Sequence, residues 1–292
     1  MRVVVFGATG TIGTALVPVL AREHDVVAVS RHERSSNGDG ITWAHADATD
    51  PESVHSALAG AEVAYYLVHS LGSSDFERRD RTAAEVVAAQ ASRSGLRQII
   101  YLGGLGDDAP DLSPHLRSRI ETGVALASGS TPVTTLRAAM VVGAGSAAFE
   151  TILALVDRLP AMVCPRWVST PTQPIALADV VAYLAAVCGR AESFGESFDI
   201  GGPDVMTYRQ MIEQIATLRG RHPLIIEVPV LTPRLSSYWL RLVTPVGAAV
   251  ARPLIEGLRT ATIVRDERIR ERIPLVLTSF ETAVSQAVAV RG

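Results

Sequence analysis

The sequence predicts an α/β fold built on a doubly wound parallel β-sheet, with a smaller C-terminal α/β lobe. Three observations predict it. Short apolar strands alternate with helical patterns along residues 3–200. The first strand, Val3–Phe6, runs directly into glycines with the spacing G-x-x-G-x-x-G. A helical pattern follows at once, with its apolar residues on one side.

The glycine turn predicts a Rossmann-type dinucleotide site. Unpaired N–H groups and the dipole at a helix N-terminus attract a pyrophosphate. Gly7 and Gly10 would allow a sharp turn and a close phosphate, and Gly13 would let the helix pack on the strand. The predicted contacts also include the other residues of this turn, namely Thr9, Thr11 and Ile12. The strand before the motif and the helix after it favour this interpretation over a plain strand–turn–helix.

Composition indicates an ordinary globular protein. Of 292 residues, 48% are hydrophobic and 20% charged, and a net charge of −3 gives no reason to expect a nucleic-acid partner. Cys164 and Cys188 have no metal-type spacing, so we expect no metal site, and a reduced, cytoplasmic protein. The predicted fold starts at residue 2, so we expect no signal peptide before the first strand. All 27 basic residues are arginine.

The end of the second strand, residues 26–29, bears on the choice of cofactor. A carboxylate there would accept from the ribose hydroxyls of NAD, whereas an arginine would pair with the 2′-phosphate of NADP. The strand ends in Ser30 and Arg31. NADP(H) is therefore preferred over NAD(H), unless Arg31 is only a solvated charge.

The third strand, residues 41–46, ends in Asp47 and Ala48. An aspartate at this position would lie beside the adenine and accept from its amine. Asp50 precedes Pro51 and is typical of the N-cap of a helix over residues 51–59.

The fourth strand, residues 61–68, is followed by a histidine and a serine. Because ligands bind at the carboxyl ends of parallel strands, we expect Leu67, Val68, His69 and Ser70 to line the cofactor groove. Catalysis by His69 is one interpretation, and packing or hydrogen bonding near the ribose is the favoured one.

Two further strands, each preceded by a helix, extend the predicted sheet. A helix over residues 76–94 precedes a fifth strand over 98–102. Ser113 and Pro114 begin a helix that extends to about residue 128, after an acidic loop. A sixth strand follows over residues 133–137.

Several of these motifs together resemble the short-chain dehydrogenase/reductase superfamily. They are Gly7-Ala8-Thr9-Gly10-Thr11-Ile12-Gly13, Asp47-Ala48, Tyr66-Leu67-Val68-His69-Ser70, Tyr101-Leu102-Gly103-Gly104-Leu105, Leu136-Arg137-Ala138, Thr172-Gln173-Pro174-Ile175-Ala176 and Phe198-Asp199-Ile200-Gly201-Gly202-Pro203. The chain is most similar to the atypical NAD(P)H-binding branch that includes NmrA-like and complex-I-accessory-like proteins. The resemblance implies an NADP(H) site, whose expected contacts also include Gly103, Arg119 and Met140, and a small substrate lobe.

The chain departs from the catalytic pattern of that superfamily. Active members use a Ser or Thr after the fifth strand and Tyr-x-x-x-Lys on the next helix. The serine-type position is occupied by Gly103-Gly104, and residues 115–119 (His-Leu-Arg-Ser-Arg) stand where Tyr-x-x-x-Lys would lie. With no lysine in the chain, the usual triad is absent.

His115 and Arg119 are the candidate substitutes, since residues four apart share a helix face. A histidine with a pKa near 6.5 is a competent general acid. Arg119 could contact the nicotinamide ribose but cannot transfer protons. The alternative for His115 is a solvated residue in the first turn of its helix.

The rest of the chain predicts two lobes. Residues 1–142 plus 172–200 are the expected NAD(P)-binding domain, and residues 143–171 plus 201–292 the expected substrate or lid lobe. Between a helix over 149–159 and the return at 172, residues 160–171 are expected to form a loop. Its Trp167 either walls the substrate pocket or packs in the interior.

The C-terminal region contains a helix capped at Thr207-Tyr208 and a strand over residues 224–230. Residues 234–259 are mostly apolar but interrupted by arginines, well below transmembrane length. Lid and wall helices are favoured there, with a peripheral membrane or partner-docking face as the alternative. Residues 265–272 alternate in charge and predict a solvated face.

Two functions are consistent with these features. The first is an NADP(H)-dependent oxidoreductase that acts on a small, apolar carbonyl or alkene substrate. The second is a sensor or scaffold that binds NADP(H) without turnover, since the triad is missing. Neither includes a nucleic-acid partner or an integral membrane segment, and the sequence does not predict the oligomeric state.

Overall fold

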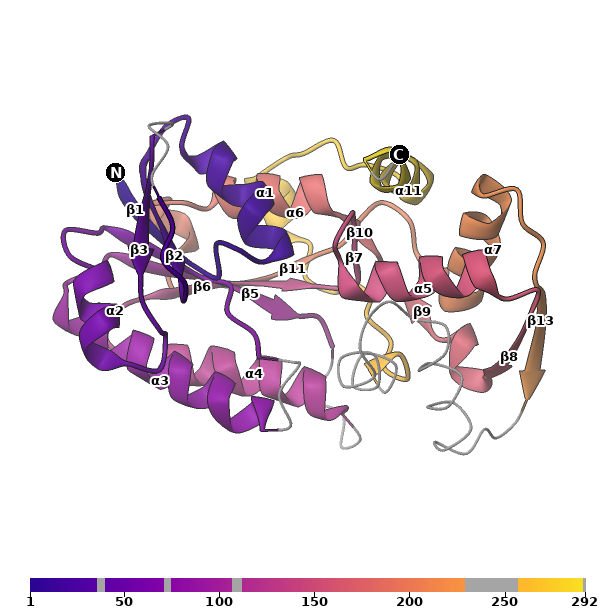
Figure 1. Ribbon diagram of the computed structural model, residues 1–292, viewed down its shortest axis with the longest axis horizontal. Helices are drawn as coiled ribbons and strands as arrows, with labels where there is room; N and C mark the ends of the chain where they lie inside the picture. The colour runs from indigo at the N-terminus through magenta and orange to yellow at the C-terminus, as the bar shows by residue number, and fades with distance from the viewer. Residues whose placement is uncertain (36–39, 71–74, 107–111, 229–256, 291–292) are drawn as a thin grey trace.

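The computed structural model describes residues 1–35, 40–70, 75–106, 112–228 and 257–290. Its centre is a seven-stranded sheet in which all neighbouring strands are parallel (Figure 1). The strands are β1 (Arg2–Phe6), β2 (Asp25–Ser30), β3 (Ile41–His45), β4 (Val63–Tyr66), β5 (Gln98–Gly104), β6 (Val133–Ala138) and β11 (Ser197–Ile200). Their order is β11-β6-β5-β4-β1-β2-β3, so the winding reverses between β1 and β4. The predicted doubly wound α/β fold is confirmed.

Helices cover both faces of the sheet (Figure 1). Successive side chains of a strand point to opposite faces, and β1 shows this clearly. Val3 and Val5 pack in the apolar cluster of one face, and Val4 and Phe6 in that of the other. The first face is covered by α1 (Thr11–Leu20) and α6 (Leu177–Ala186), and the second by α2 (Pro51–Ala57), α3 (Phe76–Arg93) and α4 (Pro114–Leu126).

Two predicted helix starts are confirmed in atomic detail. The Asp50 carboxylate accepts from the Ser53 backbone N–H at 3.1 Å and caps α2. The Ser113 hydroxyl accepts from the Leu116 backbone N–H at 3.2 Å and caps α4. Both helices end earlier than predicted.

A third apolar cluster lies beyond the carboxyl edge of the sheet (Figure 1). It joins side chains from α5 (Ala147–Arg158), β8 (Ala161–Pro165), η1 (Arg166–Ser169), α7 (Tyr208–Leu218), β13 (Leu224–Val228) and α11 (Phe280–Ala289). The shorter elements are β7 (Val141–Val142), β9 (Pro171–Thr172), β10 (Ile175–Ala176), η2 (Ala191–Ser193), β12 (Met206–Thr207) and α10 (Arg268–Arg272).

The prediction of a loop over residues 160–171 is wrong. Residues 161–165 form β8, which pairs in parallel with β13 from Ala161 opposite Leu224. The partner strand is remote in the sequence, so the local pattern around β8 cannot reveal the pairing. Trp167, in the following η1, is partly buried against the third apolar cluster, which favours packing over a pocket wall.

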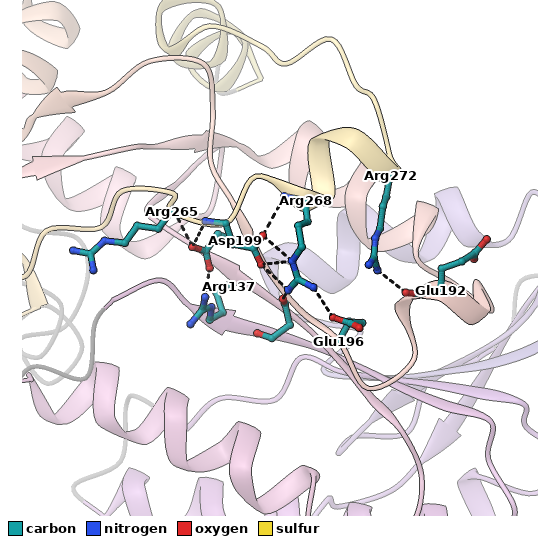
Figure 2. A network of polar contacts seen from close by, with 9 residues as sticks. Arg137, Glu192, Glu196, Asp199, Arg265, Arg268 and Arg272 are labelled. Atoms are coloured by element: carbon teal, nitrogen blue, oxygen red, sulfur yellow. Dashed lines mark hydrogen bonds and ion pairs between the residues drawn. The ribbon is translucent and has the colours of Figure 1, made fainter.

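The prediction of a solvated face over residues 265–272 holds in part, because five of these eight residues are exposed. The segment is nevertheless anchored to the protein. Ile269 of α10 is 2% exposed and packs in the cluster of one sheet face. Arg268 donates to the Glu196 carboxylate at 2.9 Å, and Arg272 donates to the Glu192 carbonyl at 2.7 Å (Figure 2). Both guanidinium groups also lie about 5 Å from the ring of Phe198 on β11. The charges therefore dock this segment on the edge strand.

Two predicted features lie outside the described residues. They are the acidic loop over residues 107–111 and most of the apolar segment, of which only residues 257–259 are described. Over the part of the chain that is described, no helix is both long and apolar enough to cross a membrane.

Candidate active site

A cavity of about 440 Å³ opens at the carboxyl ends of β1, β2 and β4. This is the edge at which the winding of the sheet reverses, where ligands of doubly wound folds bind. The cavity brings together eleven of the predicted site residues. They are Gly7, Thr9, Gly10, Ser30, Arg31, Asp47, Ala48, Leu67, Val68, His69 and Ser70.

The other predicted residues do not line this cavity. Thr11, Ile12 and Gly13 form the first turn of α1, where the Thr11 hydroxyl donates to the Gly145 carbonyl at 2.7 Å. The remaining four are Gly103 in β5, His115 and Arg119 on α4, and Met140 between β6 and β7.

The three glycines of the first turn differ in why they are needed. Gly7 has a φ of +84°, and a Cβ there would lie 2.7 Å from the Leu67 backbone. A Cβ on Gly13 would lie 2.3 Å from the Gly7 carbonyl oxygen. Packing therefore requires both glycines. A Cβ on Gly10 would lie 3.4 Å from the nearest described atom, which is an ordinary contact.

The packing of the protein therefore does not require a glycine at position 10. Gly10 is the N-cap of α1, and no side chain caps the helix there. The N–H groups of the first turn are left to bind a ligand, and the missing Cβ leaves room for it. The site fits the pyrophosphate of a dinucleotide.

Two arginines and one aspartate flank the adenine end of the predicted site. The Asp47 carboxylate accepts from the Thr49 backbone N–H at 2.9 Å and from its hydroxyl at 2.7 Å. These bonds are the main reason why the pKa of Asp47 is lowered, and Arg31 and Arg79 lower it further. Both exposed guanidinium groups therefore act on the same end of the cavity.

Sequence reasoning missed Arg79. It lies on the first turn of α3, which begins near the carboxyl edge of the sheet after β4. In a parallel sheet each crossover helix starts at that edge, so charges in its first turn are candidate ligand contacts. That rule would have found Arg79.

A partly buried hydrogen-bonded chain links His69, at the cavity wall, to α3 and α4. His69 Nδ1 lies 2.6 Å from Asp80 Oδ2, and His69 Nε2 lies 3.2 Å from His115 Nδ1. The second oxygen of Asp80 accepts from the Ser70 backbone N–H at 2.8 Å. The Asp80 side chain is 1% exposed and that of His69 is 21% exposed.

The charges of this chain follow from its surroundings. Burial favours a neutral Asp80, but hydrogen bonds from His69 and Ser70 outweigh it and lower the pKa of the carboxyl group. Burial is also the main reason why the pKa of His69 is lowered. For His115, burial, then His69 and Arg119, lower the pKa to about 3. Both imidazoles are therefore neutral at neutral pH.

The expectation that His115 titrates near pH 6.5, and the alternative that it is solvated, are both wrong. The first turn of α4 packs on the end of β5, where Gly104 leaves room for it. His115 therefore lies against His69, with ring centroids 5.1 Å apart.

Asp80 was not among the predicted site residues. It stands on the apolar face of α3 with Ala83, Ala84 and Val87, all of them buried. An acidic residue within an apolar stripe has to find a partner, and this is the signal that could have revealed it.

Arg119 stacks on an aromatic ring instead of reaching the cavity. Its guanidinium lies 5.0 Å from the centroid of the Tyr101 ring, and the Tyr101 hydroxyl donates to the Arg119 carbonyl at 2.7 Å. Arg119 adds positive charge near His69 and His115. Its contact with the ribose stays a prediction.

The comparisons with known proteins agree with this geometry. Residues 7–127 match the family model described as NAD(P)H-binding. These residues form an NAD(P)H-binding domain. The match and the shared fold support the resemblance to atypical, NAD(P)H-binding short-chain dehydrogenase/reductases.

Two curated relatives are similar over most of the chain. Subunit 9 of the mitochondrial NADH dehydrogenase [ubiquinone] 1 alpha subcomplex of Arabidopsis thaliana is 26% identical over 239 residues, or 77% of this chain. The chain spans only 60% of that subunit's length. A (4-alkanoyl-5-oxo-2,5-dihydrofuran-3-yl)methyl phosphate reductase of Streptomyces griseus is 24% identical over 75% of this chain and 74% of the enzyme.

Solved structures share the fold. A nucleoside-diphosphate-sugar epimerase of Staphylococcus aureus superposes with a TM-score of 0.78 at 16% identity, covering 98% of this chain and 100% of that one. The NADPH-dependent quinone oxidoreductase QOR2 of Escherichia coli, complexed with NADPH, superposes with a TM-score of 0.77 at 21% identity. The superposition covers 98% of this chain and 99% of the oxidoreductase.

Proposed function

We propose that the protein is an NADP(H)-dependent oxidoreductase that acts on a small, apolar carbonyl or alkene substrate. The observation that supports this most is the position of His69. It lines the dinucleotide cavity and is hydrogen-bonded to His115, so groups able to move a proton adjoin the cofactor site. The reductase and the quinone oxidoreductase among the similar proteins are consistent with this chemistry.

We assign the pyrophosphate, the adenine and the 2′-phosphate of the cofactor to residues at this cavity. The turn from Gly7 to Gly13 would hold the pyrophosphate, and Asp47 would accept from the adenine amine. Arg31 and Arg79 would pair with the 2′-phosphate, which favours NADP(H) over NAD(H). When bound, the cofactor supplies or accepts a hydride.

The substrate lobe we propose comprises residues 143–171 and 201–292. The third apolar cluster, which lies beyond the carboxyl edge of the sheet, supports this division.

His115 is the residue we propose to exchange a proton with the substrate. The hydroxyl that usually orients a substrate carbonyl is missing, because Gly103-Gly104 occupies that position. Loss of such a donor commonly costs about 100-fold in rate. The neutral imidazole of His115, held in place by a hydrogen bond to His69, is a group on α4 that can transfer a proton.

The test is the loss of NADPH absorbance in the presence of ketones, aldehydes, alkenes and quinones. We expect turnover of at least one apolar substrate, and its loss in the His115→Ala variant. The matched control is His55→Ala, because His55 is exposed on α2. Turnover that survives unchanged in His115→Ala would remove the proposed role of His115.

A second candidate function is an NADP(H)-binding sensor or scaffold without turnover. The absence of the usual triad favours it, and so does the similarity to a subunit of the mitochondrial NADH dehydrogenase [ubiquinone] 1 alpha subcomplex. Calorimetric binding of NADPH with no turnover across the panel would support this candidate and exclude the first.

A further inference from the structure

The chain Asp80–His69–His115 has a defined order of donors and acceptors. The Asp80 carboxylate is an acceptor, since its pKa is lowered and it already accepts from Ser70. His69 Nδ1, 2.6 Å away, must therefore carry a hydrogen. One hydrogen also lies between His69 Nε2 and His115 Nδ1, which are 3.2 Å apart.

Two protonation states satisfy these bonds when His115 is neutral, as its lowered pKa indicates. In the first, His69 is neutral and accepts from His115 Nδ1–H, so that His115 Nε2 is an unprotonated acceptor. In the second, His69 is an imidazolium paired with Asp80 and donates to His115 Nδ1, so that His115 Nε2 carries a hydrogen. The two states differ by one proton, which enters or leaves at His115 Nε2.

We propose that Asp80, His69 and His115 form a proton relay whose outer end, His115 Nε2, exchanges one proton with the substrate oxygen. This inference rests on the proposed oxidoreductase function. His115 is then the catalytic residue, and His69 and Asp80 are positioning residues that fix its tautomer. The relay would take the place of the missing Tyr-x-x-x-Lys pair.

For a carbonyl substrate reduced by NADPH, the step balances when it starts from the second state, which the neutral relay reaches by taking up one proton from water. As hydride adds to the carbonyl carbon, the π pair of the C=O bond moves to oxygen, which takes the proton from His115 Nε2. The N–H electron pair stays on the imidazole, and His115 Nδ1 takes the proton of His69 Nε2. His69 returns to its neutral form with Nδ1–H on Asp80, and water supplies the next proton.

Other features favour a relay over a structural contact. Asp80 is held from two sides, by Ser70 N–H and by His69, and the Ser118 hydroxyl lies 3.5 Å from its Oδ2. A buried carboxylate held this way keeps the attached imidazole in one orientation. His69 lines the cofactor cavity, so the relay starts beside the predicted nucleotide.

The first test is ¹⁵N NMR of histidine-labelled protein at neutral pH. We expect His69 and His115 both to be Nδ1–H tautomers, which is the less common form of free imidazole. In Asp80→Asn, we expect both to populate the Nε2–H tautomer. Nε2–H tautomers in the wild-type protein would overturn the relay whether or not the protein turns over a substrate.

The second test is kinetic and uses a substrate found in the NADPH screen. We expect Asp80→Asn to lower kcat by about 100-fold or more with little change in KM for NADPH. The control is Glu85→Gln, which alters an exposed carboxylate on the same helix. An unchanged kcat in Asp80→Asn would overturn the relay, whereas no turnover in the wild type would overturn the proposed function and leave the NMR result to decide the tautomers.

Discussion

The Asp199 carboxylate on β11 pairs with the Arg137 guanidinium on β6, with Oδ1 and Nη2 2.5 Å apart (Figure 2). The two residues are register partners in neighbouring strands. The other carboxylate oxygen accepts from the backbone N–H groups of Arg265 and Asp266 at 3.1 and 3.3 Å. One side chain that is 2% exposed thus joins the edge of the sheet to the C-terminal segment.

Asp199→Ala should destabilise the protein by about 3 kcal/mol. The variant leaves a guanidinium and two backbone N–H groups without their acceptor, and such groups are costly when buried. Arg137 is 40% exposed, so water offsets part of the loss. Urea unfolding, followed by circular dichroism, measures the free energy.

The control is an exposed ion pair in the same domain. Arg97 and Glu62 are 3.3 Å apart, with side chains 56% and 40% exposed. Glu62→Ala should change the free energy of unfolding by no more than about 1 kcal/mol. Equal effects of the two substitutions would show that Asp199 has no special role.

The elements predicted correctly are those whose signal is local. The turn at Gly7, Gly10 and Gly13 specifies a strand, a turn and a helix within a dozen residues. Asp50 and Ser113 mark helix starts by their own side chains. Ser30 and Asp47 were assigned to the site because they end strands, and parallel strands end at one edge.

The elements that were missed depend on partners remote in the sequence. β8 forms because β13 lies beside it, and α10 docks on Phe198 of β11 and on Glu196, which precedes that strand. The shifted pKa of His115 depends on burial by other elements and on the neighbouring His69. Residue types alone do not reveal such contacts.

Gly10→Ala and Gly13→Ala should separate ligand binding from folding. A Cβ at Gly13 would meet backbone atoms at 2.3 to 2.8 Å. Gly13→Ala should therefore unfold the domain or destabilise it by about 3 kcal/mol. A Cβ at Gly10 meets the Gly7 oxygen at 3.4 Å, so the fold should be kept.

In Gly10→Ala the methyl group should instead weaken the dinucleotide. We expect the Kd for NADPH, measured by calorimetry, to rise about tenfold or more, as for a loss of about 1.4 kcal/mol. Unchanged binding in a folded Gly10→Ala protein would mean that the pyrophosphate does not approach this residue.

Arg31→Ala should weaken NADPH much more than NADH. A guanidinium paired with the 2′-phosphate contributes about 1.5 to 3 kcal/mol, or a factor of about 10 to 100 in Kd. Arg79→Ala should act in the same direction, because both arginines act on the end of the cavity at Asp47. Calorimetric titration with each cofactor measures the ratio of the dissociation constants for NADPH and NADH.

The exposed Arg93, at the other end of α3, is the matched control for Arg79. Arg93→Ala should leave the ratio of the two dissociation constants as it is. An equal loss of NADPH and NADH affinity in Arg31→Ala would refute the assignment of the 2′-phosphate to this residue.

The stability of the protein should fall as the pH falls from about 6.5 towards 3. The ordinary pKa of histidine is 6.5, and that of His115 is about 3 in the folded protein. Between these values the unfolded chain binds a proton that the folded protein does not, so acid favours unfolding. Between the two pKa values, His115 contributes a slope of about 1.4 kcal/mol per pH unit, and above pH 6.5 it contributes none. The lowered pKa of His69 acts in the same direction.

His115→Gln should remove its share of this slope, because glutamine does not titrate. Urea unfolding between about pH 4 and pH 7 measures the free energy at each pH for both proteins. His55→Gln, which alters an exposed histidine on α2, should keep the slope of the wild type. Parallel curves for the wild type and His115→Gln would show that His115 is not held neutral by burial, since a group that titrates alike in both states contributes no slope.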